Sequence, residues 1–197
     1  MARIGWGKIL AGVVGVAAAG ATYFYLRERS SETPKHEVLR SEGAFELRRY
    51  PALLVAETVQ RGRRDRALGN GFGLLADYIF AESREGEEIA MTAPVLAQVE
   101  GKGAWRIRFI MPSVWTRGTL PKPGPGVAIG EVPERRVAAV KFGGRADNQS
   151  LAAKEVELRE WLDKEGLSAA SGAEHAFYNS PFIPGPLRHN EVLIEVA

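Results

Sequence analysis

The stretch Ile89-Ala90-Met91-Thr92-Ala93-Pro94-Val95 is apolar and directly follows the charged segment Arg84-Glu85-Gly86-Glu87-Glu88. It is too short for a helix of a globular protein, but it has the length of a buried strand. Pro94 lacks a backbone N–H and cannot donate to a neighbouring strand, which indicates a sheet edge, a bulge or a strand end. We therefore expect a strand with a special bend at residues 89–95.

Apolar periodicity predicts the elements on either side of this stretch. Period-two alternation or short apolar runs predict strands at residues 45–50, 52–59, 105–111, 127–132, 136–142, 176–182 and 192–196. Apolar side chains recur at helical spacing at about 65–81 and 148–165, so both segments are expected to be amphipathic helices packed on a sheet. The pattern indicates an α+β domain.

The pattern repeats at an offset of 87 residues. The coinciding positions are Arg48-Arg49 with Arg135-Arg136, residues 91–95 with 178–182, and hence Pro94 with Pro181. We interpret the chain as two βαββ pseudo-repeats, at about 44–111 and 131–197, related by a pseudo-twofold axis. A cleft between the helices and the sheet is then a natural position for a ligand.

An uncharged apolar segment precedes this domain. Residues 9–26 carry no charge, and roughly 20 apolar residues are needed to span a bilayer. We expect residues 1–27 to form an N-terminal transmembrane helix that serves as a membrane anchor. The alternative is a cleavable signal peptide with Ala19-Gly20-Ala21 as the cleavage site.

This interpretation divides the chain into the anchor, a linker at 28–35 and a globular domain at 36–197. The expected location is a single-pass anchor in a bacterial inner membrane, with the domain in the periplasm. Basic residues flank both ends of the apolar segment, so charge leaves the orientation open.

Charge and cysteine content exclude several classes of function. The sequence pI is about 9.0. Of the 26 basic residues, Arg3 and Lys8 lie within residues 1–26, which leaves 24 basic against 24 acidic residues in 27–197. A domain without excess positive charge gives little reason to expect a nucleic-acid partner. There is no cysteine, which excludes disulfides, thiolate zinc sites and a cysteine nucleophile.

Several short motifs resemble a known family in their order along the chain. They are Glu46-Leu47-Arg48-Arg49-Tyr50-Pro51, the stretch 89–95, Met111-Pro112-Ser113, Leu120-Pro121-Lys122-Pro123, Tyr178-Asn179-Ser180-Pro181-Phe182 and Arg188-His189-Asn190-Glu191-Val192. Over residues 36–197 the chain is similar to the SOUL/haem-binding-protein family. This resemblance implies a distorted antiparallel β-barrel with two long helices, built from a βαββ duplication. Related folds form the effector-binding domains of bacterial multidrug regulators and gyrase-inhibitor-like proteins.

The resemblance also implies a ligand. It indicates a protein that binds haem, or another tetrapyrrole or hydrophobic planar molecule, as a carrier, buffer or sensor. In some animal members a histidine proposed as a haem ligand stands in a strand motif E-x-R-H-Y, and Arg49 occupies that position here. Other members are thought to hold tetrapyrroles without a histidine, through an apolar groove with basic residues for the propionates.

Eight side chains are candidates for the ligand site. The histidines His175, His189 and His36 are candidate axial ligands of a haem iron, and Arg49, Arg136, Met91, Met111 and Tyr178 are candidate contacts to the ring and its propionates. Arginine suits a carboxylate, and methionine lines adaptable apolar pockets. Each has an ordinary alternative role, in a surface ion pair, a strand end or the core.

No catalytic motif is present, so we expect a binding protein. The sequence lacks G-x-S-x-G and H-E-x-x-H, and Gly69-Asn70-Gly71-Phe72-Gly73 has neither the third dinucleotide glycine nor a Walker lysine. The alternative is a hydrolase of the gyrase-inhibitor-like type that uses a buried glutamate such as Glu57 as a general base. A protein-interaction module at the membrane is a third hypothesis.

Overall fold

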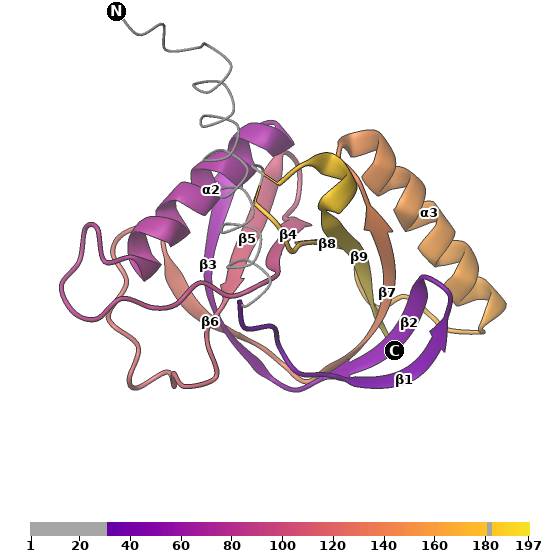
Figure 1. The fold of residues 1–197 in the computed structure, drawn as a ribbon, viewed down its shortest axis with the longest axis horizontal. Coiled ribbons are helices and arrows are strands. Elements are labelled where there is room, and N and C mark those ends of the chain that lie inside the picture. The colour runs from indigo at the N-terminus through magenta and orange to yellow at the C-terminus, as the bar shows by residue number, and fades with distance from the viewer. Residues whose placement is uncertain (1–30, 181–182) are drawn as a thin grey trace, which may run out of the picture.

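The fold is seen in a computed structural model that describes residues 31–180 and 183–197. Two long helices and nine strands make up this part of the chain (Figure 1). In chain order they are β1 Glu37–Glu42, β2 Phe45–Tyr50, β3 Leu53–Arg61, α2 Arg64–Ile79, β4 Val95–Val99, β5 Ala104–Ile110, β6 Ala128–Val132, β7 Arg135–Gly143, α3 Asn148–Lys164, β8 Glu174–Phe177 and β9 His189–Val196, with a short 3₁₀ helix η1 at Gly185–Leu187 before β9.

All nine strands belong to one antiparallel sheet, in the order β1-β2-β7-β9-β8-β4-β5-β3-β6. The sheet curls strongly, as right-handed strand twist favours, and Figure 1 shows a half-barrel. β1 and β6 are the two ends of the order. The α+β class and the two helices are therefore confirmed, but the expected barrel is an open half-barrel.

The strand order is symmetric about the central pair β4–β8. Outward from this pair, β5 and β9, then β3 and β7, then β6 and β2 occupy matching places, as a βαββ duplication predicts. The offset of 87 residues is nevertheless wrong in detail. Arg49 and Arg136 are direct cross-strand partners of β2 and β7, and Met91 precedes β4 whereas Tyr178 follows β8. Chance coincidences of residue type at one spacing produced the apparent register.

The stretch 89–94 is not a strand. Ile89 is buried, and its N–H donates to the Ile79 carbonyl at the end of α2 (2.7 Å). The Thr92 hydroxyl donates to the Ile110 carbonyl (2.6 Å), and the Ala93–Pro94 peptide bond is cis. β4 begins only at Val95. The sequence pattern predicted burial correctly, but the Ile89 N–H bonds to α2, and Thr92 bonds to β5 through its side chain.

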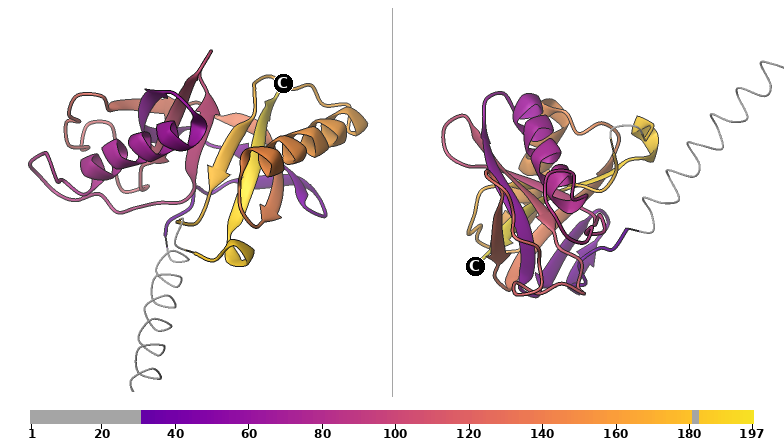
Figure 2. Two further views of the ribbon diagram at one scale, coloured as in Figure 1. Left: turned by 90° about the horizontal axis from the view of Figure 1, so that it is seen from above. Right: turned by 90° about the vertical axis from the view of Figure 1, so that its left-hand side faces the viewer.

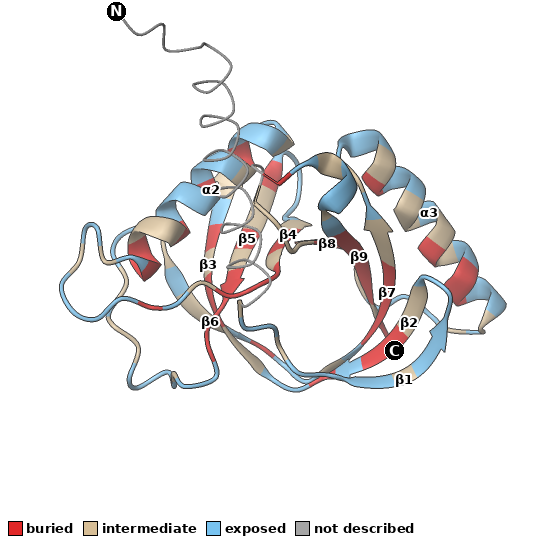
Figure 3. Cartoon of the chain, in the orientation of Figure 1, coloured by how far each residue is buried: buried red, intermediate tan, exposed pale blue. Residues whose placement is uncertain are grey.

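The two faces of the sheet carry different cores, because successive strand residues point to opposite faces. On the convex face α2 packs on β3 and β5, and α3 packs on β7 and β9 (Figures 1 and 2). On the concave face a cluster without a helix joins residues of eight strands, including Val55, Leu96, Val137 and Leu193. Buried residues accordingly gather on the strands of the half-barrel and on the inner sides of the helices (Figure 3).

The start of α3 is fixed by Asp147, whose carboxylate accepts a hydrogen bond from the Ser150 N–H (2.8 Å). Among the described residues no helix is long and apolar enough to cross a membrane. The expected anchor at 1–27 lies outside the described residues, as do Pro181 and Phe182. The anchor and the domain boundaries remain predictions.

Candidate functional site

On the convex face α2 packs on β3 and β5 and α3 packs on β7 and β9, and His175 lies on this face of the central strand β8. It is paired in register with Ala97 of β4 and Val192 of β9. The side chain is buried, with a relative exposure of 9%. Its Nδ1 atom is buried and has no hydrogen-bond partner among the described residues.

Two aromatic rings and a guanidinium surround His175. The Trp105 ring centroid lies 5.9 Å from the imidazole and that of Phe177 lies 6.3 Å away. The guanidinium carbon of Arg64 lies 6.0 Å from the centre of the Phe177 ring. Burial lowers the pKa of His175 to about 4, and the positive charge of Arg64 acts in the same direction. The imidazole is therefore neutral at physiological pH. We call His175, Trp105, Phe177 and Arg64 the convex-face cluster.

Arg64 connects the first turns of the two helices. It lies at the start of α2 and donates to the Asn148 side chain (2.7 Å) and to the Ala146 carbonyl (2.5 Å), both at the start of α3. Its Nε atom is buried and has no partner in the described part of the chain. Desolvation lowers the pKa of Arg64, yet a guanidinium stays charged in proteins. The cluster therefore offers an unsatisfied donor beside a neutral imidazole.

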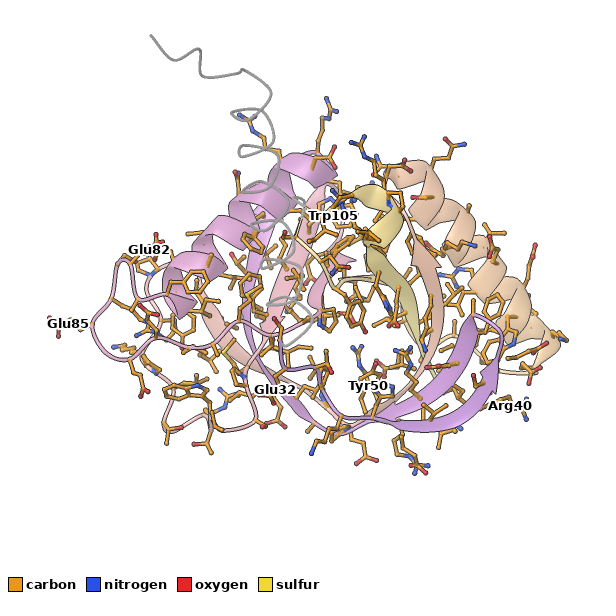
Figure 4. All side chains as sticks on the ribbon, in the orientation of Figure 1. Glu32, Arg40, Tyr50, Glu82, Glu85 and Trp105 are labelled. Carbon is orange, nitrogen blue, oxygen red and sulfur yellow. The ribbon has the colours of Figure 1, made fainter. Side chains whose placement is uncertain are left out.

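The concave face carries a cavity of about 170 Å³, which we call the mouth pocket. One wall is residues 31–36, which we call the strap. It is held by the Glu32 carbonyl, which accepts from the Ala93 N–H (2.9 Å), and by the Glu32 carboxylate, which accepts from the Ser113 N–H (2.9 Å). The lining residues are Thr33, Pro34, His36, Arg48, Tyr50, Lys141, Tyr178, His189 and Glu191. Figure 4 labels Glu32 and Tyr50 on this side of the half-barrel, and Trp105 near the start of α2.

A buried ion pair forms the floor of the mouth pocket. Arg48 donates two hydrogen bonds to the Glu191 carboxylate, each of 2.8 Å, and both residues are 1% exposed. Tyr178 and His189 also contact this carboxylate, at 2.9 and 3.0 Å. Burial alone raises the pKa of Glu191, but the hydrogen bonds from Arg48, His189 and Tyr178 outweigh it and bring the pKa to about 2. Glu191 is therefore ionised, and its carboxylate already accepts four hydrogen bonds.

The remaining polar groups of the pocket depend on this pair. Arg48 also donates to Tyr50 (2.9 Å) and to Glu46 (2.7 Å), and Glu46 contacts Lys141. The rings of His36 and Tyr50 lie 4.8 Å apart, and those of Tyr178 and His189 lie 4.3 Å apart. Burial, followed by the charge of Arg48, lowers the pKa of His36.

The structure separates the residues that the sequence offered as one site. His36, Tyr178 and His189 meet in the mouth pocket, whereas His175 lies on the opposite face of the sheet. Arg49 points outward and pairs with Glu37 (2.9 Å), beside a shallow depression of about 340 Å³ that it shares with His36. A single ligand cannot contact all of these groups, because the sheet lies between them.

Three candidates do not reach either site. Met91 and Met111 pack in the core beneath α2, which is the ordinary role of a buried methionine. Arg136 is exposed on β7 and contacts the carbonyl of Ala197. Among the described residues no group of three or more histidine, aspartate or glutamate side chains is placed to hold a metal ion.

Sequence reasoning missed the residues that organise both sites. In the mouth pocket Arg48 matters, not its neighbour Arg49, and strand alternation places Arg48 on the same face as Glu46 and Tyr50. That alternation was a signal that could have identified it. No local signal identifies Arg64 or Trp105, because only long-range packing brings them to His175.

The alternative general base, Glu57, is engaged elsewhere. Its carboxylate accepts from Arg106 (2.9 Å) and from Arg108 (3.0 Å) in the ion-pair network that continues to Glu174 and Arg135. Both carboxylate oxygens of Glu57 are thus engaged by arginine side chains. The surroundings of Glu57 therefore give no support to a hydrolase mechanism.

The sequence matches a family model over most of the described domain. Residues 31–195 match the family described as SOUL heme-binding protein. The chain belongs to the SOUL family. None of the curated proteins compared with it matches it in sequence. The SOUL match confirms the resemblance inferred from the motifs.

Solved structures share the SOUL domain's fold at low sequence identity. A hydrolase from Listeria innocua is 11% identical, with a TM-score of 0.59 over 81% of this chain and 94% of that one. The EcmrR C-terminal domain is 11% identical, with a TM-score of 0.60 over 78% of this chain and 96% of that one. A second hydrolase from Listeria innocua, encoded by lin2189, is 13% identical, with a TM-score of 0.56 over 88% and 98%. Identities this low establish the fold and leave activity open.

Proposed function

We propose that this SOUL domain binds haem or a related planar tetrapyrrole at the convex-face cluster, as a carrier, buffer or sensor without turnover. The observation that carries the proposal is the buried, neutral imidazole of His175, whose Nδ1 has no partner among the described residues. Neutral imidazole is the form that ligates metals. A bound haem would supply an iron atom, and His175 is the residue that would hold it.

The surroundings of His175 fit the rest of a tetrapyrrole. The Trp105 and Phe177 rings suit stacking on a planar apolar molecule. The Arg64 Nε–H has no acceptor among the described residues, and arginine is well suited to a propionate carboxylate. The two cavities of about 170 and 340 Å³ lie on the strap side and are not lined by the convex-face cluster. We therefore propose that the side chains of the convex-face cluster move aside to admit the ligand on the convex surface.

Titration of the full-length protein in mild detergent with haemin tests this function. We expect a saturable change in the Soret band for the wild type. His175→Ala should weaken binding by at least about tenfold, the lower bound for losing even a supporting group at a metal site. His189→Ala is the matched control and should leave the Soret band unchanged. The absence of a saturable Soret change would refute haem binding, and an unaltered His175→Ala titration would refute this site.

A second pair of variants tests the role of Arg64. Arg64→Gln should weaken binding of a porphyrin that carries propionates but not of its dimethyl ester, because only the free acid offers a carboxylate. Arg63→Gln, at the exposed neighbouring position, is the control. Equal losses for the acid and the ester would show that Arg64 acts through packing and not through charge.

We further propose that residues 1–27 tether the domain to a membrane, because residues 9–26 carry no charge. Full-length protein should sediment with membranes after an alkaline carbonate wash, and a chain that starts at residue 28 should not. Release of the full-length chain by carbonate would contradict the tether. The sidedness of the domain in the periplasm can be measured by protease protection in spheroplasts.

A further inference from the structure

The mouth pocket has hydrogen-bond donors that no described residue uses. Tyr50 accepts a hydrogen bond from Arg48, but its own O–H has no acceptor in the described part of the chain. Among the described residues the Lys141 ammonium group contacts Glu46 alone, which leaves two of its three N–H donors for another partner. Both side chains line the same cavity. The pocket can therefore bind a ligand that accepts hydrogen bonds from Tyr50 and Lys141.

The Glu191 carboxylate on the pocket floor cannot accept these additional hydrogen bonds. Glu191 receives two hydrogen bonds from Arg48, one from Tyr178 and one from His189. A carboxylate has about four lone-pair sites, so all of them are occupied. Among the described residues no further acceptor reaches Tyr50 or Lys141, so an external ligand can supply one.

Size and donor type define the chemical class of this acceptor. The cavity of about 170 Å³ has room for roughly five water molecules, at ~30 Å³ each. Charged donors bind anionic oxygens more strongly than neutral ones. We propose that the mouth pocket binds a small carboxylate of the size of acetate or propionate, as a ligand site distinct from the tetrapyrrole site.

Charge balance couples this ligand to a proton. Among the pocket groups Arg48 and Lys141 are balanced by Glu46 and Glu191, so a bound anion adds an uncompensated negative charge. Because Glu191 is ionised and only accepts, the Nε2 of His189 must carry the hydrogen in their 3.0 Å contact. The Nδ1 of His189 then has no partner in the described residues. It can take up a proton and donate to the ligand.

The groups that surround His189 carry charges of both signs. Those in contact with it are Glu191 and Tyr178, and the other charged or titratable groups of the same pocket are Arg48, Lys141, Tyr50 and His36. The two cations oppose a charged imidazole, and the Glu191 carboxylate favours it. A bound carboxylate adds a second negative charge, so affinity should rise as the pH falls through the range in which histidine titrates.

Isothermal titration calorimetry of the full-length protein with sodium propionate tests the proposal. Propionamide is the matched control ligand, because it has the same shape without the charge. We expect saturable binding of propionate, and propionamide should bind about tenfold more weakly or not at all. Tyr50→Phe should weaken propionate binding by about fivefold or more, whereas Arg49→Gln, on the opposite face of β2, should leave it unchanged.

Two further measurements test the coupling of propionate binding to a proton and the separation of the propionate site from the haem site. Wild-type affinity should increase from about pH 8 to about pH 5.5, and His189→Gln should abolish this dependence. Propionate should not displace haemin, because the two sites lie on opposite faces of the sheet. Equal binding of propionate and propionamide, an unaffected Tyr50→Phe variant, or competition between propionate and haemin would each overturn the proposal.

Discussion

The buried pair Arg48–Glu191 allows a quantitative test of how burial changes the worth of an ion pair. Glu191→Gln removes the negative charge and leaves the Arg48 guanidinium buried at 1% exposure beside a neutral amide. Removing one partner of a buried pair costs about 3–5 kcal/mol when the remaining charge is uncompensated. Because the Glu46 carboxylate still accepts a hydrogen bond from Arg48 (2.7 Å), we expect a cost at the lower end of this range. The shift of the Glu191 pKa from 4.5 to about 2 corresponds to about 3 kcal/mol at neutral pH. The cost of breaking a buried ion pair and the free energy from the Glu191 pKa shift therefore both predict a loss of about 3 kcal/mol.

The pH dependence of the same variant has a defined sign. The folded-state pKa of Glu191 lies below its unfolded value, so its contribution is complete above about pH 4.5 and is lost as the pH falls towards about 2. Glu191→Gln has no carboxyl to titrate at this position. The difference in unfolding free energy between wild type and variant should therefore be largest at neutral pH and should shrink below about pH 4.5.

The adjacent position on β2 supplies a matched control. Arg49 and Glu37 form a pair of almost the same length, 2.9 Å, but their side chains are 47% and 61% exposed. Glu37→Gln should cost about 0–1 kcal/mol. Urea unfolding followed by tryptophan fluorescence measures both variants at each pH. Equal costs for Glu191→Gln and Glu37→Gln, or a Glu191→Gln cost that does not change between neutral and acid pH, would refute the reasoning.

Two further predictions concern the convex face. A Cβ added at Gly71 would lie 2.7 Å from Cδ1 of the buried Ile107, so Gly71→Ala should destabilise the fold by about 1–3 kcal/mol. A Cβ added at Gly73 meets no atom within 4 Å, so Gly73→Ala should stabilise α2 by up to about 1 kcal/mol. Chemical unfolding measures both variants, and equal changes in their unfolding free energies would contradict this prediction. The folded-state pKa of His175 is about 4, below its unfolded value of 6.5, so wild-type stability should fall by up to about 3 kcal/mol between about pH 6.5 and about pH 4. His175→Leu should lack that loss, and an identical pH profile would contradict burial of the imidazole.

Periodicity predicted most of the regular structure, because side-chain burial repeats every 3.6 residues in a helix and every 2 in a strand. The helices expected at 65–81 and 148–165 are Arg64–Ile79 and Asn148–Lys164. β1 was missed because it is an edge strand with mostly exposed side chains and no apolar alternation. The strand expected at 176–182 is β8 at Glu174–Phe177, where the polar Glu174 and His175 hid its start.

The candidate sites were less predictable than the elements, because they depend on which face each strand residue takes and on distant partners. His175 and His189 were both identified by residue type, yet they lie on opposite faces. Choosing between Arg48 and Arg49 required the face of β2, which the neighbouring Leu47 reveals by packing in the cluster beneath α3. Arg64 lies more than 80 residues from Ala146 and Asn148 along the chain, and only the fold brings them together.

The stretch 89–94 links the fold to the concave site. Its apolar side chains anchor it beneath α2, through Ile89 and Met91, so its backbone is fixed without joining a strand. The N–H of Ala93 is then free to bond the strap at Glu32 (2.9 Å), and the strap closes one wall of the mouth pocket. Had this stretch paired as an ordinary strand, its N–H groups would be used within the sheet. Its irregular backbone therefore helps to give the open half-barrel a partly open pocket with a charged floor.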